Sequence, residues 1–326
     1  MKKLISITIA LVVALSVCAF SLSACAQKDD DGRIKIVATI FPEYDWIMNV
    51  LGDNKDNAEV TLLIDSGADL HSYQPTVADI ATVSSCDLFV YVGGESDEWT
   101  EDALKNAVNE NMKTINLLET LGDKAKTEET VDGMQNEHEG SDDGDEETEY
   151  DEHVWLSLKN ASIFVDTIAD VLCETDKENA SSYRENAAAY KLKLSELDLR
   201  YEAAVAAANI KTLLFADRFP FRYLVDDYGL NYYAAFSGCS AETEASFETV
   251  IFLAGKIDEL SLSSIMKLES SDGKIARTVR DNTANKDQRI LTLNSLQSCT
   301  LKDYSDGKTY LSLMTDNLSV LTDALS

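Results

Sequence analysis

The sequence is poor in several residue types, and each shortage narrows what the protein can be. Its 326 residues include only 28 Lys and Arg against 58 Asp and Glu, a formal net charge of −30. A surface that binds nucleic acid needs clustered basic residues, so this balance excludes nucleic acid as a partner. Beyond Phe20 no apolar run is long enough to cross a membrane. Histidine is also scarce, with three in the chain, so each histidine position is informative.

The cysteines lack CxxC or any other close spacing, which argues against a cysteine zinc cluster. Cys86 and Cys173 lie in apolar stretches, and we expect both in the core. Two interpretations stay open for Cys239 and Cys299: a disulfide between them in an oxidising compartment, or two separate thiols.

The N-terminal residues are typical of an export signal. A short basic start precedes an apolar run that ends at Phe20, and Leu22-Ser23-Ala24-Cys25 follows it. Small residues before a cysteine at this place resemble the lipobox of bacterial lipoproteins, in which the cysteine is acylated. An ordinary signal peptide or an uncleaved membrane anchor is the alternative. We expect residues 1–24 to be a signal peptide, residues 25–33 to be lipid anchor and tether, and the protein to lie on the outer face of the bacterial cytoplasmic membrane.

Short β-branched segments alternate with helical patterns through most of the chain. This alternation predicts an α/β protein whose parallel sheets are covered by helices on both faces. Each half holds about four such units, so we expect two similar lobes, residues 34–176 and 209–326. The predicted strands are 35–40, 60–64, 88–92, 114–117, 212–216, 232–236, 264–268 and 290–293. The predicted helices are 44–51, 76–84, 98–109, 159–173, 219–228, 246–260, 273–282 and 310–325.

One long helical pattern, residues 177–208, separates the halves. Apolar residues recur in it every three or four positions and mark a single stripe, and no Gly or Pro interrupts it. Some thirty residues at 1.5 Å each span roughly 45 Å, enough to run along both lobes. The alternative is an amphipathic helix packed on one larger domain. We favour a stiff helix that links the lobes and limits their relative motion.

The tract from Glu128 to Glu152 is rich in acidic residues and poor in apolar ones, which predicts a disordered loop at residues 127–150. His138 lies within it. A single histidine among carboxylates is more typical of a solvated loop than of a specific ligand. The tract's negative potential could still concentrate divalent cations nearby.

His71 and His153 are candidate metal ligands. His71 lies in GADLHSYQPT after a predicted strand, and His153 lies in DEHVWLSLKN before a predicted helix. Ligands gather at the carboxyl ends of parallel strands, and imidazole suits zinc and its neighbours. A lone loop histidine is often structural, but two in such loops of a histidine-poor chain favour a site. Zinc takes about four ligands, so carboxylates must complete the shell.

Two carboxylates stand at predicted strand ends in the second half. Glu269 closes SSIMKLE, and a charge after a buried strand must face a cleft, solvent or an ion partner. Asp217 closes KTLLFAD, and it could equally pair with Arg218 or Arg222, or cap the following helix.

Several motifs together resemble one family over residues 34–325. They are FPEYDW, GADLHSYQPT, CDLFVYVGG, DEHVWLSLKNA and YLSLMTDNLSVL. They are similar to motifs of the zinc- and manganese-binding proteins typified by ZnuA and TroA. The resemblance implies a cluster A-I solute-binding fold of two βα lobes joined by a backbone helix. It also implies a monomer that binds a divalent metal between its lobes and delivers it to the permease and ATPase of an ABC importer.

Position by position, the resemblance implies that His71 and His153 are ligands from the first lobe and that Glu269 is a ligand from the second. One position departs from the family. Ala216 stands where zinc members carry a histidine and manganese members a glutamate, so Asp217 or water would have to replace that ligand. Zinc is the expected cargo, with manganese as the alternative.

Two other classes of function compete with metal capture. Two histidines and a carboxylate with an open position also describe a hydrolytic zinc site, but no HExxH is present and no general base is evident. We therefore expect no enzymatic activity. The other alternative is an adhesin-like surface lipoprotein with a vestigial cleft.

Overall fold

A parallel sheet of four strands lies at the centre of each half of the protein. The structure, a computed structural model, describes residues 32–135, 149–240 and 244–326. Contacts divide the chain into the units Met1–Arg33 and Ile34–Ser326, and every element named below belongs to the second. The predicted signal peptide and the lipidation of Cys25 lie outside the described residues. Among the helices that are described, none has both the length and the apolar character needed to cross a membrane.

The N-terminal sheet has the order β2-β1-β3-β4, with all neighbouring strands parallel. Parallel neighbours require crossover connections, and helices supply them on both faces of the sheet. The strands are β1 (Ile34–Ala38), β2 (Ala58–Leu62), β3 (Leu88–Tyr91) and β4 (Lys113–Asn116). The helices are α2 (Phe41–Leu51), α3 (Val77–Ser85), α4 (Trp99–Lys105), α5 (Leu117–Leu121) and α6 (Leu158–Thr175).

The C-terminal sheet repeats this topology in the order β6-β5-β7-β8, again parallel throughout. The strands are β5 (Thr212–Phe219), β6 (Asn231–Ser237), β7 (Ser264–Leu268) and β8 (Arg289–Leu293). The helices are α8 (Arg222–Tyr228), α9 (Phe247–Leu260), α10 (Lys274–Asp281), α11 (Leu301–Ser305) and α12 (Tyr310–Ala324). The predicted two-lobed α/β class is confirmed. Strand β5 is longer than predicted, with an irregular register between Phe215 and Arg218, so Asp217 lies inside the strand and does not close it.

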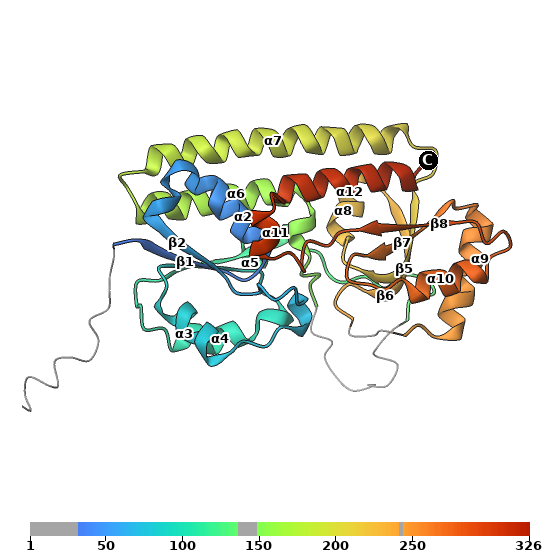
Figure 1. The fold of residues 1–326 in the computed structure, drawn as a ribbon, viewed down its shortest axis with the longest axis horizontal. Coiled ribbons are helices and arrows are strands. Elements are labelled where there is room, and N and C mark those ends of the chain that lie inside the picture. Colours follow the sequence, from blue (N-terminus) through green and yellow to red (C-terminus); the bar gives the residue numbers. More distant parts are fainter. Residues whose placement is uncertain (1–31, 136–148, 241–243) are drawn as a thin grey trace, which may run out of the picture. The chain divides into compact units, whose positions relative to one another are not determined.

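Helix α7 (Ala180–Ala207) runs along both lobes, as Figure 1 shows. Its predicted apolar stripe is buried from Tyr183 to Val205, with no member more than 3% exposed. It packs on α2 and α6 of the first lobe, and also on α8 and α12. Helix α12 ties the two halves further, because the Tyr310 hydroxyl donates to the Trp155 carbonyl over 2.7 Å and the Tyr201 hydroxyl to the Met314 carbonyl over 2.6 Å.

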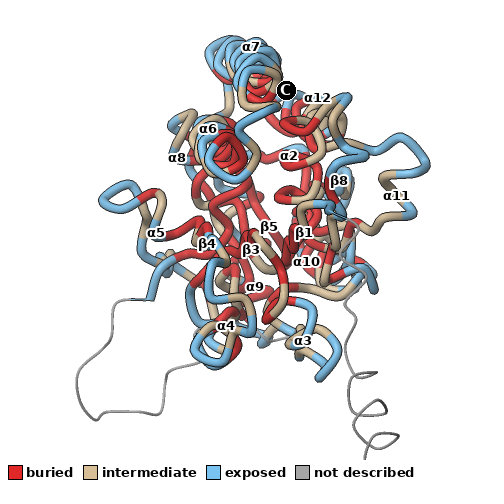
Figure 2. The backbone as a smooth tube through the Cα atoms, turned by 90° about the vertical axis from the view of Figure 1, so that its left-hand side faces the viewer, coloured by how far each residue is buried: buried red, intermediate tan, exposed pale blue. Residues whose placement is uncertain are grey.

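The largest of the hydrophobic clusters includes residues of both sheets, among them Ile36 of β1 and Phe215 of β5. In the end-on view of Figure 2 the buried residues, in red, gather beneath α7. Further hydrogen bonds join the lobes near the strand ends, including Trp155 Nε1 to the Ser295 carbonyl at 2.8 Å. A shared core and a helix common to both lobes oppose large hinge opening, because a packed interior resists deformation.

The predicted disorder of the acidic tract is wrong for its two described ends. Thr127 forms an antiparallel bridge with Tyr150, and Gln135 pairs beside Phe236 of the edge strand β6. The Glu129 carboxylate lies 3.3 Å from Arg222 Nε of the second lobe. Composition favoured disorder because the tract has few apolar residues, but these specific pairings hold its ends against the fold. His138 lies outside the described residues.

Candidate metal centre

Two short loops position the candidate histidines. His71 lies in a 3₁₀ turn (Leu70–Ser72) after β2, and the Asp69 carboxylate accepts the His71 backbone N–H at 3.1 Å. His153 follows the ordered end of the acidic tract and directly precedes the 3₁₀ turn Val154–Leu156. The Asp151 carboxylate accepts the His153 backbone N–H at 2.8 Å. In both loops an Asp two residues earlier fixes the turn from which the histidine projects.

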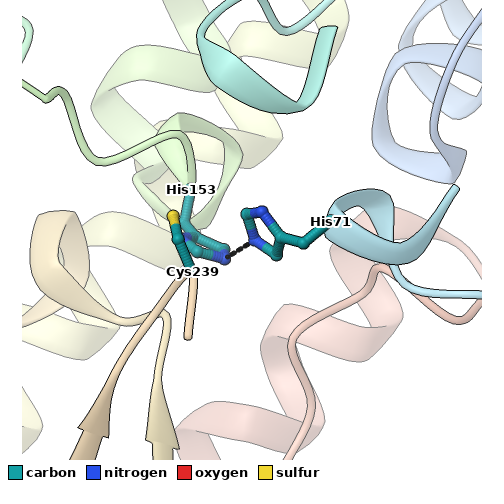
Figure 3. Close-up of side chains that lie close together, drawn as sticks. All are labelled: His71, His153 and Cys239. Carbon is teal, nitrogen blue, oxygen red and sulfur yellow. Dashed lines mark hydrogen bonds between the residues drawn. The ribbon is translucent and has the colours of Figure 1, made fainter. Parts of the chain in front are cut away.

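The two imidazoles face each other through their Nε2 atoms, which are 3.0 Å apart (Figure 3). His153 Nδ1 lies 3.0 Å from the Asp151 carboxylate, which accepts only from a protonated Nδ1 and thereby leaves a lone pair on Nε2. His71 Nδ1 lies 2.7 Å from Ser96 Oγ and 3.4 Å from Glu152 Oε2. A carboxylate bonded to the far nitrogen of a ring, as Asp151 is to His153, is the arrangement that orients a histidine toward a metal, whereas the hydrogen-bond partner of His71 Nδ1 is the Ser96 hydroxyl.

The surroundings keep His71 in its neutral form. Burial, then the nearby His153 and Arg218, lower the pKa of His71 to about 3, against the opposing effect of Asp69. Burial raises the pKa of Glu152, whose Oε2 has no hydrogen-bond partner among the described residues. Because neutral imidazole is the form that binds a metal, His71 has no positive charge to lose before it binds one near neutral pH.

A third potential ligand, Cys239, lies beside the two rings in Figure 3. One nitrogen each of His71 and His153 and the Cys239 sulfur all lie within 4.8 Å of one another. No Asp or Glu of the described ranges belongs to this group. Burial, followed by the charges of Glu128, Asp151 and Glu152, raises the pKa of the Cys239 thiol. Sequence reasoning missed this residue because it stands in no metal motif and because two cysteines of the C-terminal half invited pairing.

The carboxylates predicted from the second lobe are bound to the protein itself. The Asp217 oxygens accept the backbone N–H groups of Leu268, at 3.1 Å, and of Arg218, at 2.9 Å. The Glu269 oxygens accept the backbone N–H of Ser295 at 2.8 Å and its hydroxyl at 2.7 Å. Asp217 therefore joins strands β5 and β7. Ala216 is buried and offers no ligand atom.

Of the two interpretations left open for Cys239 and Cys299, the structure has the two separate thiols. Cys86 and Cys173 are free and buried, as predicted for core residues. Cys239 instead lies in the histidine group, and the arginine side chain of Arg218 lies against the His71 loop. Arg218 Nη2 lies 2.6 Å from the Asp69 carboxylate, an ion pair between the second lobe and the His71 loop.

The fold and the facing imidazoles define a two-lobed, helix-linked solute-binding protein. The chain belongs to the family described as zinc-uptake complex component A, periplasmic (ZnuA), whose model matches residues 36–324. The predicted family is thus confirmed, as is the expectation of a binding protein rather than an enzyme, since the family is a component of an uptake complex.

Relatives and solved structures agree with this assignment. The chain is 33% identical over 311 residues to the zinc-binding lipoprotein AdcA of Streptococcus pneumoniae, covering 94% of this chain and 59% of that protein. It is 28% identical over 320 residues to the high-affinity zinc uptake system protein ZnuA of Bacillus subtilis, covering 95% and 96%. The chain therefore spans about three-fifths of the length of the streptococcal relative.

Among solved structures, the Zn(II)-bound ZnuA-like domain of Streptococcus pneumoniae AdcA superposes with a TM-score of 0.70 at 29% identity, over 90% of this chain and 99% of that one. A mutant structure of the laminin-binding adhesin Lmb of Streptococcus agalactiae gives a TM-score of 0.71 at 26% identity, over 90% and 100%.

Proposed function

We propose that this protein captures Zn²⁺ as cargo between His71 and His153 and delivers it to the permease of an ABC importer. The observation that carries the proposal is the pair of Nε2 atoms 3.0 Å apart, with a carboxylate behind each ring. Two nitrogens on one tetrahedral zinc ion, at 2.0–2.1 Å each, lie about 3.3 Å apart. A separation of the rings by a few tenths of an ångström would therefore admit the ion.

The surroundings support a closed, preorganised site. His153 is fully buried, and the shared core limits how far the lobes can part. Capture then needs small adjustments of the loops, and release needs a partner that separates them. A permease whose docking pulls on the two lobes, driven by its ATPase, fits this requirement. Lipidation at Cys25 would keep the protein, as a monomer, on the outer face of the membrane where the permease is reached.

The second lobe's contribution is less direct. Glu269 could supply a carboxylate, because each of its oxygens keeps a lone pair beyond the bond to Ser295, but it would have to move into the histidine group. Asp217 is the weaker candidate, since leaving its two backbone donors would leave them unpaired inside the sheet.

Zinc is favoured over manganese by two arguments. The relatives named above are zinc-binding or zinc-uptake proteins. The facing imidazoles also offer nitrogen, whereas manganese prefers oxygen ligands. An adhesive role is the second candidate, supported by the likeness to the laminin-binding adhesin. Binding of laminin that persists in the presence of a chelator would favour it.

The test is calorimetry and elemental analysis on the chain without residues 1–25, which retains the compact unit Ile34–Ser326. The parent should bind one Zn²⁺, and the double variant His71→Ala/His153→Ala should lose that binding. His138→Ala is the matched control, since it removes the third histidine of the sequence and keeps His71 and His153. Zinc binding of equal strength in the parent and the double variant would refute the proposal.

A further inference from the structure

We propose that Cys239 is the protein ligand that the second lobe contributes to the cargo, and that its sulfur makes the site selective for thiophilic ions. The inference rests on zinc capture by His71 and His153. It assigns the second-lobe ligand, which Ala216 cannot supply, which Asp217 supplies only by leaving its backbone donors, and which Glu269 supplies only by moving toward the histidines.

Geometry is the first support. One ring nitrogen of each histidine and the Cys239 sulfur lie within 4.8 Å of one another, and His71, His153 and Cys239 form the single such group found among the described residues. On a tetrahedral zinc ion with Zn–N near 2.0–2.1 Å and Zn–S near 2.3 Å, nitrogen and sulfur are about 3.6 Å apart. A shift of about an ångström in the Cys239 loop would bring all three onto one ion, with the fourth position left for water or Glu269.

The loop that carries Cys239 is built to approach the histidines closely. Gly238 precedes it, and a Cβ there would lie 2.8 Å from His153 Cε1 and 2.9 Å from the Phe219 carbonyl oxygen. No side chain other than hydrogen fits at such distances. The glycine therefore permits the turn after β6 to press against the His153 ring, which places the next residue beside the site.

The backbone of Cys239 is held as well. Its N–H donates to Glu128 Oε1 at 3.1 Å, so the ordered start of the acidic tract fixes the cysteine from the side. On the following residue, the Ser240 carbonyl accepts from Arg218 Nη1 at 3.4 Å. A loop fixed on both sides presents its thiol at a defined position, as a ligand requires.

When Cys239 coordinates the ion, its sulfur exchanges a bond to hydrogen for a bond to the metal. The thiol loses its proton to solvent as the sulfur bonds to Zn²⁺, so one Zn–S bond forms, one S–H bond breaks and no electron is transferred. Thiolate favours zinc and cadmium, while manganese prefers carboxylates and water. Such a site would join the lobes through one ion, with nitrogen from the first and sulfur from the second.

The test is a Co²⁺ titration of the chain without residues 1–25, with Co²⁺ as a spectroscopic substitute for zinc. The parent should show an intense near-ultraviolet band of thiolate-to-cobalt charge transfer, which Cys239→Ser and Cys239→Ala should both lack. Cys299→Ser is the matched control, since Cys299 is the other cysteine of the same lobe, and it should keep the band. Zinc affinity should fall by about 10–100-fold in Cys239→Ser, because the loss of even an outer partner of a ligand typically costs that much. Cd²⁺ should outcompete Mn²⁺ on the parent, by a margin that narrows in the variant.

The outcomes separate the two proposals. A parent that binds Zn²⁺ through the histidines but gives no thiolate–cobalt band, or a band that Cys299→Ser abolishes, overturns the role of Cys239 alone. Unchanged zinc affinity in a folded Cys239→Ser variant does the same. A parent without zinc affinity overturns the proposed function itself. Should the Cys239 variants fail to fold, the cobalt spectra of the parent and of Cys299→Ser still decide.

Discussion

The two lobes share one topology but contribute to the candidate site in different ways. In the first lobe, two loops point imidazoles at each other, and carboxylates of Asp151 and Glu152 lie behind the rings. In the second lobe, the carboxylates at the corresponding sheet edge bind their own backbone, and a cysteine on a glycine-preceded turn lies nearest the histidines. Equivalent folds thus supply a prearranged half, which carries the two histidines, and a half whose nearest potential ligand is one cysteine.

A carboxylate in a strand can stabilise the sheet instead of binding a ligand. Asp217 accepts two backbone N–H groups at the irregular part of β5, where regular pairing with its neighbours is interrupted. A backbone donor left unpaired inside a protein costs free energy, so the carboxylate stabilises the strand at that point. In the prearranged half the histidines do not have to pair with unpaired backbone donors, because other residues fix the turns of the loops that carry them.

The largest expected effect tests this structural role. Asp217→Ala should reduce the free energy of unfolding by about 2–4 kcal/mol, since it leaves two buried donors without acceptors. Zinc affinity of the folded variant should change little. Urea unfolding and zinc calorimetry measure the two quantities, with Asp316→Ala on the exposed face of α12 as control. If Asp217→Ala instead lost much of its zinc affinity and kept its stability, Asp217 would be a metal ligand, and the two lobes would not differ in the way described.

The next effect concerns the prearranged half. Asp151→Asn should weaken zinc binding by about 10–100-fold, because the amide can donate to His153 Nδ1 and so place the ring proton on Nε2, where the metal would bind. Competition with a chromophoric chelator measures the affinity. Glu149→Gln, an exposed acid of the same segment, should bind zinc as the parent does. Equal affinity in Asp151→Asn would mean that the ring needs no carboxylate behind it.

The smallest effect concerns the ion pair between the halves. Arg218→Gln removes a positive charge near His71 and frees the Asp69 carboxylate, so zinc affinity should rise by about fivefold, roughly 1 kcal/mol. Calorimetry at low ionic strength should show the gain, and added salt should reduce it. Lys274→Gln, an exposed basic residue of the same lobe, should show none. If Arg218→Gln bound zinc more weakly than the parent, the ion pair between Arg218 and Asp69 would instead hold the lobes in the arrangement that binds the metal.

Much of the architecture was predictable because its signals are local and repeated. The apolar stripe of α7 recurs at helical spacing, and all its members are buried. His71 and His153 were predictable because histidine is so rare in the chain. Cys239 was not, because its approach to His153 depends on Gly238 and on the packing of β6, neither of which forms a recognisable motif. The ordered ends of the acidic tract were missed because they are held by partners distant in sequence, such as Phe236.

The sequence by itself determined the alternation of strands and helices, the helix that links the lobes, and the two loops that carry histidine, because each depends on periodicity or residue type within a short window. Only the tertiary structure decided that Asp217 and Glu269 bind backbone groups, that Arg218 pairs with Asp69, and that a cysteine stands beside the histidines. A side chain's partner is decided by which segments meet in space. A carboxylate can bind an ion or accept hydrogen bonds from the backbone of a strand. It takes the second role where an otherwise unpaired N–H donor lies beside it.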